Sequence, residues 1–502
     1  MSSHEIGRFR SGLSRVPPNS SAESMAQLID SWLDNSFSKR ILRFCTVRDG
    51  CGRRVELALR RYAGEDVKTC LACSTAYHIV SAILNSIFGK SRLENATIRQ
   101  ELKVSMWRKG LASVLEGIGR YGINKPFTGF SPFLIVWNLT RACNLNCVHC
   151  YESAHARAPD ELDTDQAKLA VRKLADAGVA YIALSGGEPF TRHDLFQIIE
   201  EIERNEMAFS LATNGTLVTR KVAARLKQLN CGFVQVSLDG ATPHIHNSFR
   251  GAKSFERTVE GVRNLVDAGI NVGVAATATK HNLSEIPYVV DKAEELGAML
   301  FMCYNFIPTG RGINMKRKDL SPKEREKLLN WMAEQIGKRK LNLLSTAPQY
   351  SRICNNIGQL NLTHFDTFAQ SHQAFAESAR FLGEFVGGCG AARLYCALEP
   401  NGDIEPCVFI PLTVGNILRD DFTKLWHNHP TFKKIRDRES FKGYCGTCEY
   451  RNLCGGCRAQ SYAYFNDLTE SDPGCILNVK RAQPIQRPCI EMKQIKTIES
   501  YA

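Results

Sequence analysis

Between Phe133 and Thr309, short apolar runs alternate with segments of helical periodicity. The runs are rich in β-branched and aromatic residues, as is typical of buried strands: PFLIVW, AYIALSGG, AFSLATNG, GFVQVSLDG, NVGVAATAT and MLFMCYNF. The segments between them, such as SFERTVEGVRNLVDAG, place their apolar residues on one helical face. Repeated alternation of strand and helix predicts parallel strands joined by right-handed crossovers. We therefore predict an α/β fold in which residues 131–310 form a partial (β/α)6 barrel of the TIM type.

The regions on either side of this barrel follow other patterns. After a basic start, residues 1–130 show helical periodicity in STAYHIVSAILNSIF and LASVLEGIGR, which predicts a helical N-terminal domain. Residues 311–388 are expected to be mostly helical connecting material. Residues 389–480 are dense in cysteine and are expected to form a C-terminal extension, followed by a tail at 481–502.

The composition favours a globular protein of a reducing compartment. Apolar residues make up 44% of the 502 residues, as in ordinary globular domains. The first twenty residues lack the apolar centre of a secretory signal peptide, so we expect a cytoplasmic location. In such a chain, 19 cysteines favour metal or redox chemistry over disulfides.

The net charge of +13 is concentrated at the N-terminal end. Residues 1–130 hold 20 Lys and Arg against 11 Asp and Glu, so this region carries +9 of the total. A basic region can meet a phosphate-bearing substrate, an anionic membrane surface or nucleic acid, or it can be a solvated face without a ligand. No DNA-reading zinc finger or RNA-binding signature accompanies it, so we expect no specific nucleic-acid partner. Peripheral membrane contact stays open.

Three cysteines stand directly after the first predicted strand, in WNLTRACNLNCVHCYES. Cys143, Cys147 and Cys150 have the spacing Cys-x3-Cys-x2-Cys, at the carboxyl end of the strand, where barrels of this type place their chemistry. A zinc knuckle with His149 or His155 as fourth ligand is one interpretation. The other is an iron–sulfur cubane held by three thiolates, which leaves one iron open for a substrate or cofactor.

The cysteine loop and the run SGGEP after the second strand together resemble the radical S-adenosylmethionine (radical SAM) enzymes. This resemblance implies that S-adenosylmethionine binds the open iron of a [4Fe–4S] cluster and is cleaved by one electron to a 5′-deoxyadenosyl radical. The radical then abstracts a hydrogen atom from a substrate, while the protein orients the two molecules.

The resemblance also implies cofactor contacts around the rim of the barrel. The expected residues are Gly186, Gly187, Glu188, Asn214, Ser237 and Arg250. Glycines allow close approach of the backbone, and Glu188 with nearby carbonyls can accept bonds from an ammonium group. Arg250 suits a carboxylate, although a surface salt bridge is its alternative. Thr213 is a weaker candidate, and Asp239 fits a turn or cap as well as a ligand contact.

The cysteine-dense C-terminal region resembles the SPASM extension of the same family, which carries two auxiliary [4Fe–4S] clusters. By position, the first cluster would use Cys389, Cys396, Cys407 and Cys457, and the second Cys445, Cys448, Cys454 and Cys475. The family's last pair usually has one more intervening residue than Cys454-Gly-Gly-Cys457. A single four-ligand zinc site, or one auxiliary cluster with fewer ligands, are the alternatives.

The remaining cysteines divide into two sets. Cys45, Cys51, Cys70 and Cys73 would suit a zinc or rubredoxin-like iron site, or they are free thiols of a helical core. Cys231 and Cys303 are expected in the barrel core, and Cys354 and Cys489 are unassigned.

These observations together predict an enzyme that abstracts hydrogen from a substrate, with auxiliary clusters for electron transfer and an external reductant such as ferredoxin or flavodoxin. The substrate class stays open among a peptide or protein, a haem-type tetrapyrrole and a lipid. A non-enzymatic iron–sulfur or zinc scaffold is the competing class, but it leaves the barrel, the three-cysteine loop and SGGEP without a role.

Overall fold

The computed structural model describes residues 36–88, 95–358 and 384–479. The basic start, the predicted tail at 481–502 with Cys489, and residues 359–383 of the predicted connecting region lie outside the described residues.

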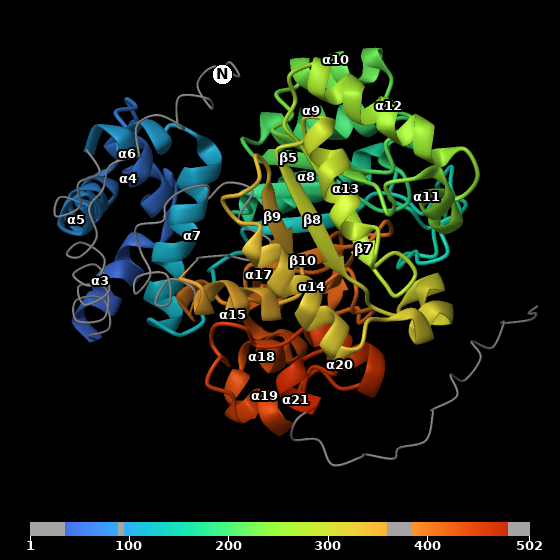
Figure 1. The fold of residues 1–502 in the computed structure, drawn as a ribbon. Helices are drawn as coiled ribbons and strands as arrows, with labels where there is room; N and C mark the ends of the chain where they lie inside the picture. The colour runs from blue at the N-terminus through green and yellow to red at the C-terminus, as the bar shows by residue number, and fades with distance from the viewer. Residues whose placement is uncertain (1–35, 89–94, 359–383, 480–502) are drawn as a thin grey trace, which may run out of the picture.

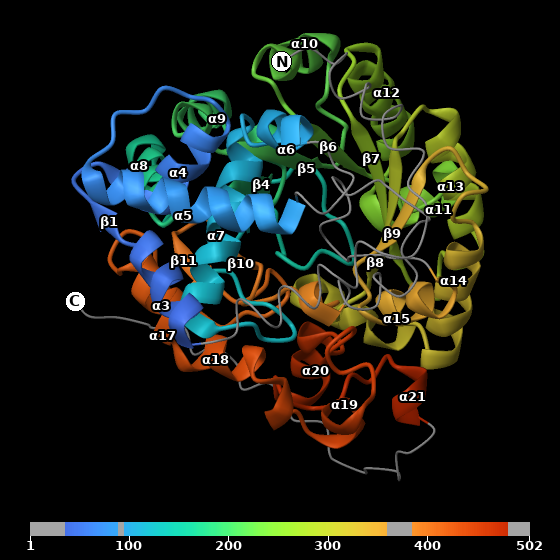
Figure 2. The same ribbon diagram turned by 90° about the vertical axis from the view of Figure 1, so that its left-hand side faces the viewer.

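The N-terminal part is helical, as its periodicity predicted, and it packs around a core of its own. It lies to one side of the large sheet, and Figure 2 shows its helices facing the viewer. A short antiparallel hairpin, which the sequence pattern did not indicate, interrupts the helices. The elements are α3 (Ser36–Cys45), β1 (Arg48–Asp49), β2 (Gly52–Arg53), α4 (Arg54–Tyr62), α5 (Leu71–Phe88), α6 (Asn95–Glu101) and α7 (Ser105–Tyr121).

The centre of the chain forms the predicted partial barrel of parallel strands covered by helices (Figure 1). All six predicted strands are present, and each pairs in parallel with the next in chain order: β3 (Leu134–Asn138), β4 (Tyr181–Ser185), β5 (Ala208–Thr213), β6 (Phe233–Ser237), β7 (Val272–Ala278) and β8 (Leu300–Asn305). The helices around them are α8 (Thr164–Asp176), η1 (Pro189–Thr191), α9 (Leu195–Arg204), α10 (Arg220–Gln228), α11 (Pro243–Arg250), α12 (Ser254–Asp267) and α13 (Ile286–Glu295).

The helix-to-strand joints of the barrel use a left-handed residue to end each helix. Gly178, Gly269 and Gly297 have φ values of 88°, 70° and 80°. After α10 the same conformation falls on Asn230, with φ 49°, two residues before Gly232. Glycine and asparagine adopt this conformation more easily than other residues, and it lets the chain turn directly into the next strand.

Two further parallel strands extend the barrel beyond the predicted six. The region predicted to be mostly helical, 311–388, also contributes β9 (Asn342–Ser345), which pairs with β8. The cysteine-rich region contributes β10 (Tyr395–Leu398), which pairs in parallel with β3 at the opposite edge. Antiparallel β11 (Asp403–Glu405) and β12 (Gly415–Asn416) continue that edge, so the described sheet has the order β12-β11-β10-β3-β4-β5-β6-β7-β8-β9. Between β8 and the C-terminal region lie η2 (Gly310–Lys318), α14 (Pro322–Glu334) and α15 (Gln349–Asn356).

The rest of the cysteine-rich region is a set of short helices joined by loops, of which α18, α19, α20 and α21 lie at the bottom of Figure 1. They are α17 (Phe422–Asn428), α18 (Pro430–Arg436), η3 (Arg438–Ser440), α19 (Gly443–Thr447), α20 (Arg458–Phe465) and α21 (Ile476–Val479). Trp426 is fully buried, and its indole Nε1–H donates to the carbonyl oxygen of Gly129 at 3.1 Å, which ties α17 to the segment before β3. None of the helices in the described residues is both long and apolar enough to cross a membrane.

Candidate active site

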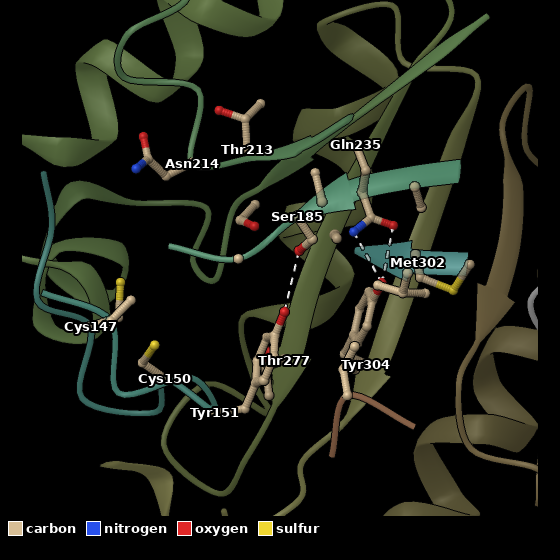
Figure 3. A pocket seen from close by; sticks show the side chains of 18 of the residues that line it. Cys147, Cys150, Tyr151, Ser185, Thr213, Asn214, Gln235, Thr277, Met302 and Tyr304 are labelled. Atoms are coloured by element: carbon tan, nitrogen blue, oxygen red, sulfur yellow. Dashed lines mark hydrogen bonds between the residues drawn. The ribbon is translucent and has the colours of Figure 1, made fainter. Parts of the chain in front are cut away.

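The three clustered cysteines lie where the pattern predicted them, in the loop after β3 at the carboxyl ends of the strands. Cys143, Cys147 and Cys150 line one end of a cavity inside the barrel (Figure 3). Polar residues at the ends of the next four strands also line it: Ser185, Gly186, Gly187, Thr213, Asn214, Ser237 and Thr277. The predicted rim residues therefore converge on one space, with Glu188 as the exception.

The glycines after β4 support the cysteine loop through backbone packing. Gly187 N–H donates to the carbonyl oxygen of Thr140 at 2.6 Å, and Glu188 N–H donates to that of Ala142 at 2.9 Å. A Cβ on Gly187 would overlap the carbonyl of Ala142, and one on Gly186 would lie 2.7 Å from that of Thr140. The sequence suggested that these glycines allow approach of a ligand. The structure shows that they first allow two loops to approach each other.

Glu188 is not among the residues that line the cavity, and its carboxylate braces the end of β5. Its carboxylate is fully buried and accepts hydrogen bonds from Thr213 Oγ1 at 2.8 Å, Asn214 N–H at 2.8 Å and Phe190 N–H at 3.3 Å. Burial raises the pKa of Glu188 to about 7, even though these three donors favour the charged form. The carboxylate was expected to meet an ammonium group of the cofactor, but here it positions Thr213 and Asn214, which do line the cavity.

We expect Glu188→Gln to destabilise the protein by about 1–3 kcal/mol, because an amide NH₂ would face buried N–H donors that need an acceptor. The thermal unfolding midpoint, measured anaerobically, should fall, and S-adenosylmethionine should bind more weakly because the loop of Asn214 loses its brace. Glu200→Gln is a matched control, since Glu200 only makes an exposed ion pair with Arg225, worth about 0–1 kcal/mol. Equal midpoints for the two variants would contradict the bracing role.

Arg250 lines the cavity but is held by a buried carboxylate. Its Nε donates to Asp239 Oδ2 at 2.6 Å, and its Nη1 lies 3.9 Å from the Sγ of Cys147. Asp239 also accepts from Thr277 N–H at 2.7 Å. Burial alone would raise the pKa of Asp239, but Arg250 and then His149 outweigh it and lower that pKa. Asp239 thus anchors the guanidinium beside the cysteine loop, and Nη2 of Arg250 lies 3.5 Å from His149 Nε2. A guanidinium has five N–H donors, so these contacts leave further N–H groups of Arg250 that suit a carboxylate.

His149 is not placed as a ligand beside the cysteines. Its Nε2 lies 3.3 Å from Asp239 Oδ2, and its ring meets Phe249 edge-on with centroids 5.2 Å apart. Burial lowers the pKa of His149 to about 4, so the ring is neutral near pH 7. The backbone of His155 forms an isolated parallel β-bridge with that of Ala142. In the described part of the chain, neither histidine joins the loop cysteines in a group tight enough for one metal ion, which disfavours the zinc-knuckle interpretation.

The other end of the cavity is formed by apolar and aromatic side chains. Inside the barrel, Tyr304 and Gln235 hydrogen-bond to each other at 3.1 Å, next to Met302 (Figure 3). The segment after β11 adds Val408 and Phe409, and the ring of Phe409 meets that of Tyr151, which follows Cys150, at 4.9 Å. Residues of the cysteine-rich region therefore form part of the cavity wall.

The first predicted auxiliary set is only partly assembled. Cys389 and Cys407 both contribute, after burial, to raising the pKa of Cys457, and the hydroxyl of Tyr395 donates to Cys407 Sγ at 3.1 Å. Cys396 is separate from these three. Side chains alternate along a strand, so Cys396 points away from the cavity that its neighbour Tyr395 lines. It is fully buried in the outer core, where Arg436 is the charged neighbour that affects its pKa.

The cysteines of the second predicted set are electrostatic neighbours of one another. Cys475 and Cys445 each add to the effect of burial in raising the pKa of Cys454, and Cys445 does the same for Cys448. Backbone N–H groups point at the sulfurs: that of Gly456 lies 3.4 Å from Cys454 Sγ, and that of Asp472 lies 3.4 Å from Cys445 Sγ. The two sets are close, since Cys389 N–H donates to the carbonyl of Cys454 at 3.2 Å.

These sulfurs fit clusters better than single ions. Within the described residues, one group of cysteine, histidine and acidic side chains is tight enough for a single ion, and it lies in the N-terminal part. The barrel loop and C-terminal sets are more widely spaced, as several bridged irons require. Burial raises the pKa of Cys143 to about 11, so its proton would be released when a metal binds. N–H donors near sulfur are also a feature of iron–sulfur sites.

The N-terminal cysteines divide differently from the prediction. Cys45 is buried in the helical core, where burial raises the pKa of its thiol to about 11, and it belongs to no metal-binding group in the described part of the chain. Cys51, Cys70 and Cys73 do come together, with Asp49 as a fourth member that the sequence reasoning missed. Cys231, Cys303 and Cys354 are buried in the core.

Comparison with known proteins agrees with this site. Family models match residues 137–293, as the radical SAM superfamily, and residues 389–449, as an iron–sulfur cluster-binding domain named SPASM. An AdoMet-dependent heme synthase of Methanosarcina barkeri is 37% identical over 349 residues, which cover 69% of this chain and 97% of the relative. Mycofactocin maturase MftC of Mycobacterium tuberculosis is 31% identical over 354 residues, 69% of this chain and 83% of the relative.

Solved structures share the fold at lower identity. Streptococcus suis SuiB bound to S-adenosylmethionine matches with a TM-score of 0.56 and 17% identity, over 84% of this chain and 91% of that one. The enzyme anSMEcpe with bound AdoMet matches with a TM-score of 0.53 and 20% identity, over 69% and 94%. The chain is an enzyme that belongs to the radical SAM superfamily, with a C-terminal SPASM domain and with [4Fe–4S] clusters and S-adenosylmethionine as its cofactors.

Proposed function

We propose that this enzyme oxidises its substrate, a haem-type tetrapyrrole, by removing a hydrogen atom and then an electron, while a proton or carbon dioxide leaves from the carbon next to the radical. The observation that carries the proposal is the position of one cavity between two groups of cysteines. Cys143, Cys147 and Cys150 line it at the carboxyl end of β3, and Tyr395, which pairs with Leu134 at the start of β3, lines it toward the other end of the strands. Tyr395 donates to Cys407, and Val408 follows it in the chain.

The residues of each end have separate tasks. Cys143, Cys147 and Cys150 would hold the cluster that binds S-adenosylmethionine, with Asn214, Ser237 and Arg250 around the cofactor. When bound, the clusters would supply the electron that cleaves S-adenosylmethionine at one end and an acceptor for the substrate's electron at the other. The interior of the barrel between the two ends keeps the substrate out of water and positions its C–H bond.

A tetrapyrrole is favoured by the relatives and by the chemistry of the lining. The heme synthase of Methanosarcina barkeri aligns over 97% of its length, so the matched part contains that relative's whole catalytic unit. The lining of the cavity includes Phe233, Met302, Tyr304 and Phe409, which suit the flat apolar faces of a macrocycle. The mycofactocin maturases, about 31% identical, make a peptide the second candidate. An external one-electron reductant of the ferredoxin or flavodoxin type would complete the system.

The test is an anaerobic assay of the reconstituted enzyme with S-adenosylmethionine, a chemical reductant and iron-coproporphyrin III. We expect 5′-deoxyadenosine to rise on addition of the tetrapyrrole, and mass spectrometry to detect an oxidised tetrapyrrole in matching amount. When a side chain of the tetrapyrrole carries deuterium, the deuterium should appear in 5′-deoxyadenosine. Cleavage of S-adenosylmethionine that no tetrapyrrole stimulates, with stimulation by a peptide instead, would replace this substrate class by the second candidate.

A further inference from the structure

A compact group of four potential metal ligands lies in the N-terminal part, away from the barrel cavity. Asp49 and Cys51 belong to the β1–β2 hairpin, while Cys70 precedes α5 and Cys73 lies in its first turn. The ligand atoms of all four lie within 4.8 Å of one another. β1, α4, α5 and α8 lie together on this side of the molecule (Figure 2).

The distances match the edges of a tetrahedron around one ion. The Sγ atoms of Cys70 and Cys73 are 3.5 Å apart, and Cys73 Sγ lies 3.6 Å from Asp49 Oδ2. Cys70 Sγ lies 3.9 Å from the same oxygen. Zinc bonds of about 2.3 Å to sulfur and about 2.1 Å to oxygen give tetrahedral edges of roughly 3.4–3.8 Å. A disulfide would need a sulfur separation of about 2.05 Å, so the pair is not one.

The local backbone prepares this arrangement. The N–H of Cys51 donates to Asp49 Oδ1 at 2.9 Å, which closes the hairpin turn, and Gly52 has a φ of 123° that disfavours other residues. Arg54 Nε donates to Asp49 Oδ2 at 2.8 Å and fixes the carboxylate, as partners of metal ligands commonly do. A carboxylate has about four lone-pair positions, so Asp49 retains room for a metal. The start of α5 favours negative charge on Cys70 and Cys73.

We propose that Asp49, Cys51, Cys70 and Cys73 bind one Zn²⁺ ion in a closed structural site. Three thiolates and a carboxylate complete four-coordination, so no position is open for a substrate. The close spacing favours one ion over a multi-iron cluster, and none of the four residues lines the cavity. The ligands lie outside the residues matched by the family models, 137–293 and 389–449.

The site would fasten the N-terminal helices to the barrel. Arg48, next to Asp49, donates to Asp176 Oδ1 at 3.2 Å and to its carbonyl at 3.3 Å, at the end of α8. Arg53, at the other side of the hairpin, pairs with buried Glu116 of α7 and lies against Gly178. An ion that holds the hairpin rigid would also hold Arg48 and Arg53 in position. It would thereby stabilise their contacts with Asp176 and Gly178, between α8 and β4.

The test measures zinc, iron and sulfide per chain in the full-length protein, reconstituted anaerobically and washed with a chelator. The wild type should contain about one zinc in addition to its iron. The double variant Cys70→Ser/Cys73→Ser should lose that zinc and keep its iron and sulfide. Cys45→Ala is the matched control, since Cys45 is a core cysteine of the same part of the chain and should keep the zinc.

Two further measurements protect the test against misfolding of the double variant. Asp49→Cys should keep one zinc and retain it at higher chelator concentration, because a thiolate replaces the carboxylate. Growth with cobalt should give the wild type the visible absorption of a tetrahedral Co²⁺ thiolate site. A wild type without zinc overturns the proposal, and so does loss of iron and sulfide together from the double variant, which would indicate a cluster.

Discussion

Replacing Cys147 by alanine is expected to abolish formation of 5′-deoxyadenosine. Cys147 is the most buried of the three loop cysteines that line the cavity, and Arg250 Nη1 lies 3.9 Å from its sulfur. Two cysteines are too few to hold a cluster with one open iron, so the iron count should fall by about four. The measurement is anaerobic chromatography of 5′-deoxyadenosine with excess reductant, together with iron analysis.

A control variant separates this effect from a loss of folding. Cys303 lies in β8 between Met302 and Tyr304, which line the cavity, so its own side chain points into the outer core. Cys303→Ala should therefore retain both cleavage and iron content, with a small loss of stability of about 1 kcal/mol. If Cys147→Ala cleaved S-adenosylmethionine at the rate of Cys303→Ala, the assignment of the loop as the catalytic centre would fail.

The barrel and its rim were predictable because their signals are local. Each of the six strands carries its own apolar run, and each is followed by a helix with one apolar face. The three loop cysteines lie within eight residues of one another, directly after a strand. Parallel strands bring residues at their carboxyl ends, such as Asn214 and Ser237, to the same edge as the loop. Arg250, at the end of α11, was expected there from the resemblance to the radical SAM enzymes.

The two outer strands were missed because their signals are not local. β9 has the sequence NLLS, which is too short to show a period. β10 pairs with β3 over a separation of about 260 residues, and no pattern near either strand indicates that pairing. Its sequence, YCAL, was considered only for the spacing of its cysteine.

Spacing alone also grouped two thiols with cysteines from which the structure places them apart. Counting residues between cysteines does not tell on which face of a strand or helix each side chain lies. Cys396 lies on the outer face of β10, and Cys45 points into the core at the end of α3. Asp49 was missed because the chain has 51 acidic residues and most carboxylates are solvated. The informative signal was the turn Asp49-Gly-Cys51 followed by Cys70-x2-Cys73 at a helix start.

Cys457→Ala is expected to separate cleavage of S-adenosylmethionine from formation of product. Cys457 lies near Cys389 and Cys407, and Tyr395, which lines the cavity, donates to Cys407. Loss of Cys457 should therefore remove the first auxiliary cluster and about four irons. The loop cysteines are untouched, so 5′-deoxyadenosine should still form. Oxidised product should fall by more than about tenfold, since loss of an outer-shell partner of a metal ligand alone typically costs 10–100-fold.

Cys396→Ala should be measured beside Cys457→Ala, because sequence spacing and structure disagree on whether Cys396 binds the first auxiliary cluster. Spacing made Cys396 the fourth ligand of the same cluster, whereas strand alternation points it toward the opposite face, into the core near Arg436. If the structure is right, Cys396→Ala should keep the full iron content and product yield, with about 1 kcal/mol lost from the core. Loss of about four irons from both variants would restore Cys396 as a ligand. It would also mean that β10 shifts by one residue when the cluster binds, because only a change of register moves a side chain to the other face of a strand.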